Sequence, residues 1–344
     1  MSKILVAMSG GVDSAVAVKL LLDAGHEVEG VTFTVEASDE AEAALRDARL
    51  CAEAYGIPHR ALDLSAEFDC AVKADFVREY ERGRTPNPCV VCNRHIKFGY
   101  LVRYAEENGF DFVATGHYAK ISREGGRVRL ERGADGSKDQ SYMLAHVPEE
   151  NLKKAILPLG EYTKEEIRDV AASLGLVSAN KKDSQDICFI PDGDYVGFLT
   201  RYRGRAPVEG DYVDENGNIL GRHRGQECCT IGQSRGLGIA LGRRVFVLDK
   251  NAERNTVTLG DPDALMKSEV ILENVNYIGV DGIRDGEAFQ VKIRYAHRAA
   301  DARLYNVDGG LVRAAFDTPQ RAPSPGQLAV IYDGERVIGG GVIA

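Results

Sequence analysis

One short string near the start of this chain limits its fold more than any other feature. The string Ser9–Ser14, which reads SGGVDS, follows the apolar run Ile4–Ala7 and precedes a helix-like pattern over Ala15–Ala24. A strand, a tight turn and a helix start are therefore expected in direct succession. Adjacent glycines permit backbone angles that other residues rarely adopt, and they bring the N–H groups of the turn close to a ligand. With the positive end of the helix dipole, this turn predicts a phosphate or pyrophosphate site.

Strand and helix patterns alternate through the first half of the chain. Further strands are expected at Val28–Phe33, Arg60–Leu64 and Phe112–Thr115, and helices at Asp39–Tyr55, Ala66–Tyr80, Lys97–Asn108 and Thr163–Leu174. The last helix begins with a Thr-x-x-Glu capping box, Thr163 and Glu166. This alternation favours a parallel sheet covered by helices on both faces, with ligands beyond the carboxyl ends of the strands.

The pattern changes to short strands and Gly- or Asn-containing turns after about Arg205. Such spacing is typical of all-β domains and favours a barrel. The predicted fold class is therefore α/β plus β. We expect an α/β domain over residues 1–205, a small β-rich central domain over 206–268 and a C-terminal β-barrel over 269–344.

The charge balance restricts the partners of the chain. The net charge is -9 over 344 residues, which argues against non-specific coating of nucleic acid but permits a local basic cleft. Since no apolar run approaches about 18 residues and no apolar leader precedes the first strand, we expect no membrane span and a cytoplasmic location. The seven cysteines are then expected to be reduced.

Two cysteine segments stand out from the rest. Cys89 and Cys92 form a Cys-x-x-Cys beside two prolines at an expected helix start, a position that lowers the pKa of a thiol. By itself this motif fits half of a zinc site, a redox dithiol or part of an iron–sulfur site. Cys188 follows a polar run and fits either a buried thiol or a loop facing a site. The remaining cysteines are expected in the core, namely Cys51, Cys70, Cys228 and Cys229.

The Ser9–Ser14 string resembles the pyrophosphatase loop of enzymes that cleave ATP to AMP and pyrophosphate. The chain as a whole resembles the tRNA-specific 2-thiouridylases. The segments that carry this resemblance are Met8–Ser14, Gly83–Phe98, Thr115–Tyr118, Lys138–Leu144, Asp183–Ile190, Thr230–Gly238, Arg294-Tyr295 and Pro325-Gly326-Gln327. The resemblance implies an adenylating domain with the pyrophosphatase loop, a small central domain and a C-terminal barrel. It also implies ATP and Mg²⁺ as cofactors and tRNA as a partner.

The resemblance assigns roles to individual residues. It places at the ATP site Ala7, Met8, Ser9, Gly10, Gly11, Val12, Asp13, Ser14, Phe33 and Gly116. It places near the target base Asn87, Pro88 and Cys89. It places at tRNA contacts Lys138, Asp139, Gln140, Arg294, Tyr295, His117 and Gln327. Cys92 is implied as the nucleophile and Cys188 as the carrier of a persulfide. Many members have Asp at the position of Cys89 and Met at the position of Phe33.

The implied chemistry has two steps and more than one sulfur route. AMP transfer to the oxygen at position 2 of the wobble uridine makes that oxygen a leaving group, and sulfur then replaces it. The sulfur arrives from a donor protein or from sulfide. It is carried either on a Cys188 persulfide or on a 4Fe-4S cluster held by Cys89, Cys92 and Cys188. Two alternatives are another adenylating synthetase or amidotransferase of this superfamily, and an inactive tRNA-binding sulfur carrier.

Overall fold

The N-terminal part contains the predicted parallel sheet. The computed structural model describes residues 1–174 and 187–344. Five parallel strands lie in the order β3-β2-β1-β4-β7. Their bounds are β1 Lys3–Ala7, β2 Glu27–Thr34, β3 His59–Asp63, β4 Phe112–Ala114 and β7 Ala155–Ile156. The four strands expected from the sequence are confirmed.

Helices cover both faces of this sheet because both faces of its central strand are apolar. Ile4 and Val6 pack with residues of α1 (Val12–Asp23) and α2 (Asp39–Tyr55). Leu5, between them, packs on the opposite face with α6 (Leu101–Glu107). α9 (Lys164–Ser173) packs against α1 and carries the predicted capping box at Thr163. The predicted helix over Thr163–Leu174 is confirmed, since α9 ends at Ser173 and Leu174 is its C-cap.

Two long helical stretches lead toward the cysteines. The first consists of α3 (Ser65–Phe68), a π-helical turn (Asp69–Lys73) and α4 (Ala74–Glu81). The second consists of α5 (Pro88–Cys92), a π-helical stretch (Asn93–Tyr100) and α6. The second helix therefore begins well before Lys97, since Asn87 and Pro88 provide its N-cap and first residue. π turns inside helices occur frequently at functional sites.

The prediction that the other four cysteines lie in the core is only partly correct. Cys70 is exposed, because the apolar stripe of its helix runs through Phe68, Val72 and Phe76 on the opposite side. Cys228 ends a short 3-10 turn and, like Cys51, is only partly buried. Cys229 is buried as expected.

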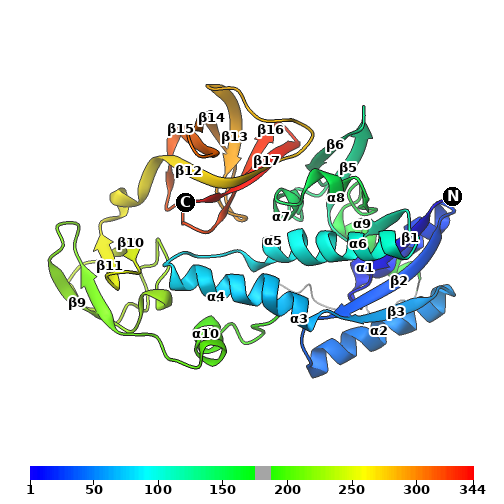
Figure 1. Ribbon diagram of the computed structural model, residues 1–344, viewed down its shortest axis with the longest axis horizontal. Coiled ribbons are helices and arrows are strands. Elements are labelled where there is room, and N and C mark those ends of the chain that lie inside the picture. Colours follow the sequence, from blue (N-terminus) through cyan, green and yellow to red (C-terminus); the bar gives the residue numbers. More distant parts are fainter. Residues whose placement is uncertain (175–186) are drawn as a thin grey trace.

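The central part is a small β-domain. It follows α10 (Tyr195–Arg203) and has the strand order β10-β11-β8-β9. The bounds are β8 Gly210–Val213, β9 Ile219–His223, β10 Phe246–Asn251 and β11 Thr256–Gly260. In Figure 1 this domain lies at the opposite end of the long axis from the parallel sheet, and the C-terminal barrel lies between and above them.

The C-terminal strands form a closed antiparallel barrel. The order is β12-β15-β14-β13-β16-β17, and pairing of β17 with β12 closes it. The bounds are β12 Met266–Tyr277, β13 Glu287–Lys292, β14 Ala300–Val307, β15 Leu311–Arg321, β16 Leu328–Asp333 and β17 Arg336–Ile343. A hairpin of the N-terminal part, β5 (Ala119–Glu124) and β6 (Arg127–Arg132), extends this sheet at β17. The sequence did not indicate this pairing.

Short helices complete the region between the hairpin and α9. They are α7 Ser141–Leu144 and α8 Glu149–Leu152. Across residues 1–174 and 187–344, none of the helices has both the length and the apolar character that a membrane crossing requires.

Candidate active site

The glycine loop lies at the carboxyl end of β1 and leads directly into α1. Gly10 has a φ of +70°, and a Cβ there would lie 2.4 Å from the Ala44 carbonyl oxygen of α2. The N-cap of α1 is Gly11, which supplies no side chain to the first N–H groups of the helix. The Ser14 hydroxyl donates to the Gly11 carbonyl and accepts from the Ser9 N–H, so one polar side chain braces the turn. The resulting geometry suits an anion at the helix N-terminus.

A buried lysine from α9 approaches this loop, and sequence reasoning missed it. The Lys164 ammonium lies 2.8 Å from both carboxylate oxygens of Asp13, and the Tyr118 hydroxyl donates to the same carboxylate at 2.7 Å. Lys164 is only 7% exposed although it is the first residue of a helix. A cation is unfavourable beside the positive end of a helix dipole. The position of Lys164 in the sequence was therefore a signal that this lysine interacts with a group outside its own helix.

Several residues expected at the ATP site have side chains that pack into the core. The side chains of Met8 and Val12 are buried in the core, and Ala7 packs against it. The Met8 carbonyl accepts from the Thr32 hydroxyl, which also bonds to His59. A Cβ on Gly116 would lie 3.0 Å from the backbone of Asp13, so this glycine lets the end of β4 contact the loop closely.

The cysteine helix begins beside two rigid residues. Asn87 is the N-cap of α5, its side chain accepts from the Val90 N–H, and Pro88 is the first helical residue. Cys89 is exposed and Cys92, one turn later, is buried. Both lie where the sequence predicted a helix start.

The fold brings the second cysteine segment to this helix. Cys92 belongs to an apolar cluster with Phe189 and Ile190, and Phe33 at the end of β2 packs against the same cluster. Cys188 is exposed, and its charge influences the pKa of Cys92. The part of the Cys188 motif at residues 183–186 lies outside the described residues. Cys92, Cys188 and Phe33 thus converge, although they are distant in the sequence.

The thiols of this site are more basic than the sequence indicated. Burial raises the pKa of Cys92 to about 12, with Lys97 opposing the rise. Cys89 and Cys188 are exposed at one side, yet the protein around them also raises the pKa of each thiol by desolvation. The prediction that the helix start lowers the pKa of Cys89 and Cys92 is wrong for this conformation, because desolvation of the thiolate outweighs the helix dipole.

The three cysteines do not form a metal centre in this conformation. Cys89, Cys92 and Cys188 are close enough to influence one another electrostatically. Among residues 1–174 and 187–344, however, no three His, Cys, Asp or Glu side chains are grouped so that they hold a metal ion. These cysteines therefore do not assemble the ligands of a single metal ion as the chain stands. A Mg²⁺ ion requires fewer protein ligands, because it binds through one or two carboxylates together with substrate phosphates. The carboxylate of Asp13 fits that role.

Residues expected to contact tRNA lie in two segments, around residues 139 and 295, and these segments are in contact. The Tyr295 hydroxyl of the barrel donates to the Asp139 carbonyl at 3.1 Å, so the segments around 139 and 295 adjoin. The Asp139 carboxylate is buried and accepts from Gly133 and Ser141. Gln140 accepts from the Tyr118 N–H. The side chains of Asp139 and Gln140 therefore hold the loop, while Lys138 is partly buried and Tyr295 is exposed.

Arg294 joins the barrel to the central domain. Its guanidinium donates to the carbonyls of Ala322 and Ile231 and to the Ser324 hydroxyl. It lines a pocket between the two domains together with His297 and Arg321, and Cys228 and Gln233 also line this pocket. The pocket offers arginine cations to an anion.

His117 and Gln327 do not face an open surface in the expected way. His117 is buried, bonds to the Thr115 hydroxyl at 2.7 Å and has a pKa well below its usual range because of burial, so it is neutral. The Gln327 side chain donates to the Thr85 carbonyl at 2.7 Å. Each is therefore occupied by a contact within the protein.

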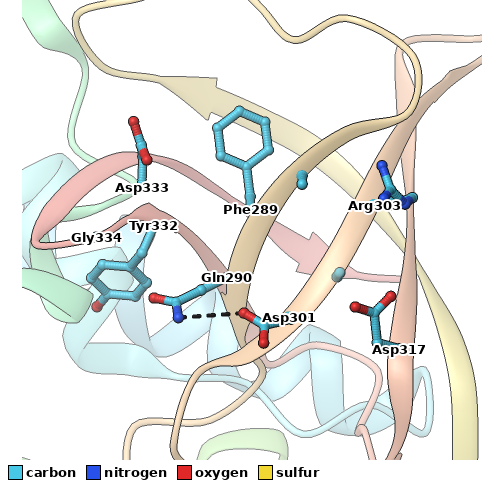
Figure 2. Close-up of a pocket in the computed structure, with 10 residues that line it drawn as sticks. Phe289, Gln290, Asp301, Arg303, Asp317, Tyr332, Asp333 and Gly334 are labelled. Atoms are coloured by element: carbon cyan, nitrogen blue, oxygen red, sulfur yellow. Dashed lines mark hydrogen bonds between the residues drawn. The ribbon is translucent and has the colours of Figure 1, made fainter.

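A second pocket lies on the barrel and has the opposite character. Figure 2 shows Asp301, Asp317 and Asp333 around a hollow that also contains Arg303 and Phe289. Gln290 donates to Asp301 at 3.4 Å. Because carboxylates outnumber cations here, this face of the barrel is unsuited to the phosphates of RNA.

Comparisons with known proteins cover the whole chain. The model of the tRNA methyl transferase HUP domain matches residues 2–192, the tRNA methyl transferase PRC-barrel domain matches 196–261, and the aminomethyltransferase beta-barrel domain matches 267–343. The tRNA-specific 2-thiouridylase MnmA of Lachnoclostridium phytofermentans is 43% identical, and the alignment covers 100% of this chain and 99% of that protein. The protein of the same name from Desulforudis audaxviator is 46% identical with the same coverage.

Solved structures give a weaker likeness. The U34-tRNA thiolase NcsA from Methanococcus maripaludis, solved with its [4Fe-4S] cluster, aligns with 58% of this chain and 66% of its own length. The identity is 18% and the TM-score is 0.37, which is too low to bear on the site.

Proposed function

This chain belongs to the tRNA-specific 2-thiouridylase family, and from that premise we propose that it uses ATP to exchange the oxygen at position 2 of the wobble uridine of tRNA for sulfur. The observation that carries the proposal for the site is the convergence of Cys92, Cys188 and Phe33. Phe33 lies near the carboxyl end of β2, the neighbour of the strand β1 that leads into the glycine loop. This convergence supports a site in which the loop binds pyrophosphate and the two thiols transfer sulfur.

In the first step, the uridine carbonyl oxygen attacks the α-phosphorus of ATP and pyrophosphate leaves. The loop N–H groups at the start of α1 bind the leaving pyrophosphate. Lys164 neutralises Asp13 in the present conformation, and we propose that it moves to the phosphates when the nucleotide binds. A Mg²⁺ ion, when bound with the nucleotide, supplies further charge neutralisation on the phosphates, and Asp13 is its candidate ligand.

In the second step, a persulfide on Cys188 supplies the sulfur. Its terminal sulfur attacks the activated carbon, AMP leaves, and the base is joined to Cys188 through a disulfide. The Cys92 thiolate then attacks the Cys188 sulfur, which releases the thiolated base and leaves a Cys92–Cys188 disulfide. Two electrons from external thiols reduce that disulfide. Because Cys188 is exposed, a donor protein that carries a persulfide can pass its outer sulfur to the Cys188 thiolate, and the donor thiol leaves. Alternatively, sulfide attacks the Cys188 sulfur of the Cys92–Cys188 disulfide before external thiols reduce it, which gives the Cys188 persulfide and the Cys92 thiolate.

The resting state keeps the nucleophile protonated. With a pKa of about 12, Cys92 is a neutral thiol at neutral pH. Lys97 is the cation that favours its thiolate. We propose that binding of the target base exposes Cys92 to this charge and thereby favours its thiolate. Before the base is activated, the protonated Cys92 does not attack the Cys188 persulfide.

Substitution of the cysteines tests the function. Cys92→Ser and Cys188→Ser are expected to lose sulfur incorporation into tRNA while ATP binding remains, and sulfur incorporation is measured with purified tRNA, ATP and a persulfide donor. Cys70→Ser is the control, since Cys70 is exposed but lies away from the site's apolar cluster. Incorporation of ammonia instead of sulfur would identify another adenylating enzyme, and absence of AMP release with tRNA would identify an inactive carrier.

The persulfide route has its own test at Cys89. Cys89→Asp restores the residue that many family members carry, so activity is expected to survive. Cys89→Ser is expected to remain active as well, because the route does not use this thiol. Iron found in anaerobically purified protein, and lost together with activity in Cys89→Ser, would contradict the route and favour a three-cysteine cluster.

A further inference from the structure

A turn of the barrel holds the chain just before the cysteine helix. The Thr85 N–H donates to the Pro325 carbonyl at 2.8 Å. The side-chain amide of Gln327 donates to the Thr85 carbonyl at 2.7 Å and contacts the Pro86 carbonyl at 3.4 Å. Both backbone polar groups of Thr85 are therefore bound by the same barrel turn.

The contact between turn and loop is unusually close. Gly326 has a φ of +88°, and a Cβ there would lie 3.0 Å from the Thr85 nitrogen and from Arg84 Cβ. The Arg84 side chain next to it pairs with Glu79 of α4 and Glu273 of the barrel. The barrel and the α/β part are thus fastened together at this point by backbone and side-chain contacts.

Little flexible chain separates this attachment from the thiols. Pro86 and Pro88 fix their own backbone angles and restrict the residues before them. Asn87, between them, is held by its cap contact to Val90. Cys89 follows directly, and Cys92 lies one helical turn later. A displacement at Thr85 is therefore passed on to the thiols rather than absorbed.

The same turn is tied to the arginine that joins barrel and central domain. The Gln327 N–H donates to the Ser324 carbonyl at 3.1 Å, and Arg294 donates to the Ser324 hydroxyl. Ser324 is 1% exposed. One short segment thereby contacts the central domain through Arg294 and the cysteine loop through Gln327.

We propose that Gln327 is a positioning residue for the cysteine helix, and that the barrel sets the position of Cys89 and Cys92 through it. This role differs from the tRNA contact that the resemblance implies for Gln327. It rests on the proposed function for its catalytic consequence. Its structural consequence, the placement of two thiols, exists in the free protein.

The test compares Gln327→Leu with Gln320→Leu. Gln320 is also a barrel glutamine whose side chain donates to a backbone carbonyl, but its partner is Thr318 on its own strand. The rates of iodoacetamide alkylation at Cys89 and Cys92 are measured by mass spectrometry without tRNA or ATP. Thiolation is measured as kcat and KM for tRNA, and tRNA affinity by filter binding.

Gln327→Leu is expected to accelerate alkylation of the buried Cys92 and to lower kcat by about tenfold or more, because small misplacements of reacting groups cost large factors in rate. KM and Kd for tRNA are expected to stay within about twofold, and Gln320→Leu to resemble wild type. If Gln327→Leu folds poorly, Gln327→Asn serves instead, since its amide is one methylene too short to reach Thr85.

Two outcomes would overturn the proposal. Unchanged alkylation with weakened tRNA binding would make Gln327 an RNA contact, and unchanged alkylation with unchanged kcat would leave it without a role. Altered alkylation in a protein that does not thiolate tRNA would support the positioning role while the proposed function fails, so the two failures are distinguishable.

Discussion

At the scale of single residues, burial decides the chemistry of the thiol that the sequence marks as the nucleophile. Cys92 lies one turn into a helix and near Lys97, and both features favour a thiolate. Burial opposes them and raises the pKa of Cys92 to about 12. The desolvation of an anion therefore outweighs a partial helix charge and one cation.

Alkylation of Cys92 in the free protein is expected to accelerate about tenfold for each pH unit between pH 7 and 9. The sign follows from the raised pKa, because the thiol is protonated below about 12 and the reactive thiolate increases with pH throughout this window. The measurement is iodoacetamide labelling with site-specific mass spectrometry. Free cysteine is the reference, because its alkylation rate levels off once the pH exceeds its pKa of about 8.5. A plateau for Cys92 below pH 9 would contradict the burial argument.

At the scale of elements, α9 supplies the loop with a charge that the loop itself does not contain. Its capping box, formed by Thr163 and Glu166, fixes where the helix begins. That start places Lys164 against Asp13 at the start of α1. The capping box thus has a functional consequence, because it determines the position of the cation.

Lys164→Ala is expected to reduce AMP formation about a hundredfold, since it removes a positioned charge at the pyrophosphate. Binding of tRNA is expected to persist, because Lys164 lies at the loop. Lys19→Ala is the matched control, as Lys19 pairs with Asp23 on the outer face of α1. The assay is tRNA-dependent release of AMP from labelled ATP. AMP formation at the wild-type rate in Lys164→Ala would show that the lysine only stabilises the fold.

At the scale of the whole molecule, the α/β part and the barrel share one core. The β5–β6 hairpin pairs with β17 through Val337 and Leu130. Leu130 is fully buried in a cluster that contains Leu5 of the parallel sheet and Val330 of the barrel. The two parts are therefore joined by packing as well as by the chain, which suits a site assembled from both.

Leu130→Ala is expected to lower the free energy of unfolding by about 2–5 kcal/mol, because it leaves a cavity in this shared core. The sheet and the barrel are expected to unfold together, so urea transitions followed by far-UV circular dichroism and by tyrosine fluorescence should coincide. Val307→Ala, on an exposed position of the barrel, is the control and is expected to change stability by less than about 0.5 kcal/mol. A barrel that unfolds separately in wild type would contradict a shared core.

The sequence by itself determined the features that depend on neighbouring residues. The glycine loop could be predicted because Gly10 adopts a backbone conformation that suits glycine. The start of α9 could be predicted because Thr163 and Glu166 satisfy the helix N–H groups locally. The strands β1 to β4 followed from their apolar patterns, and the family resemblance drew the two cysteine segments together as one proposal.

Only the tertiary structure decided which distant groups meet and how solvent reaches them. Lys164 pairs with Asp13, Gln327 holds Thr85, and β6 joins the barrel through contacts between segments more than a hundred residues apart. No local periodicity encodes such pairings, since they depend on how the parts pack. The pKa of Cys92 belongs to the same class, because desolvation is a property of everything packed around the thiol and not of the helix that carries it.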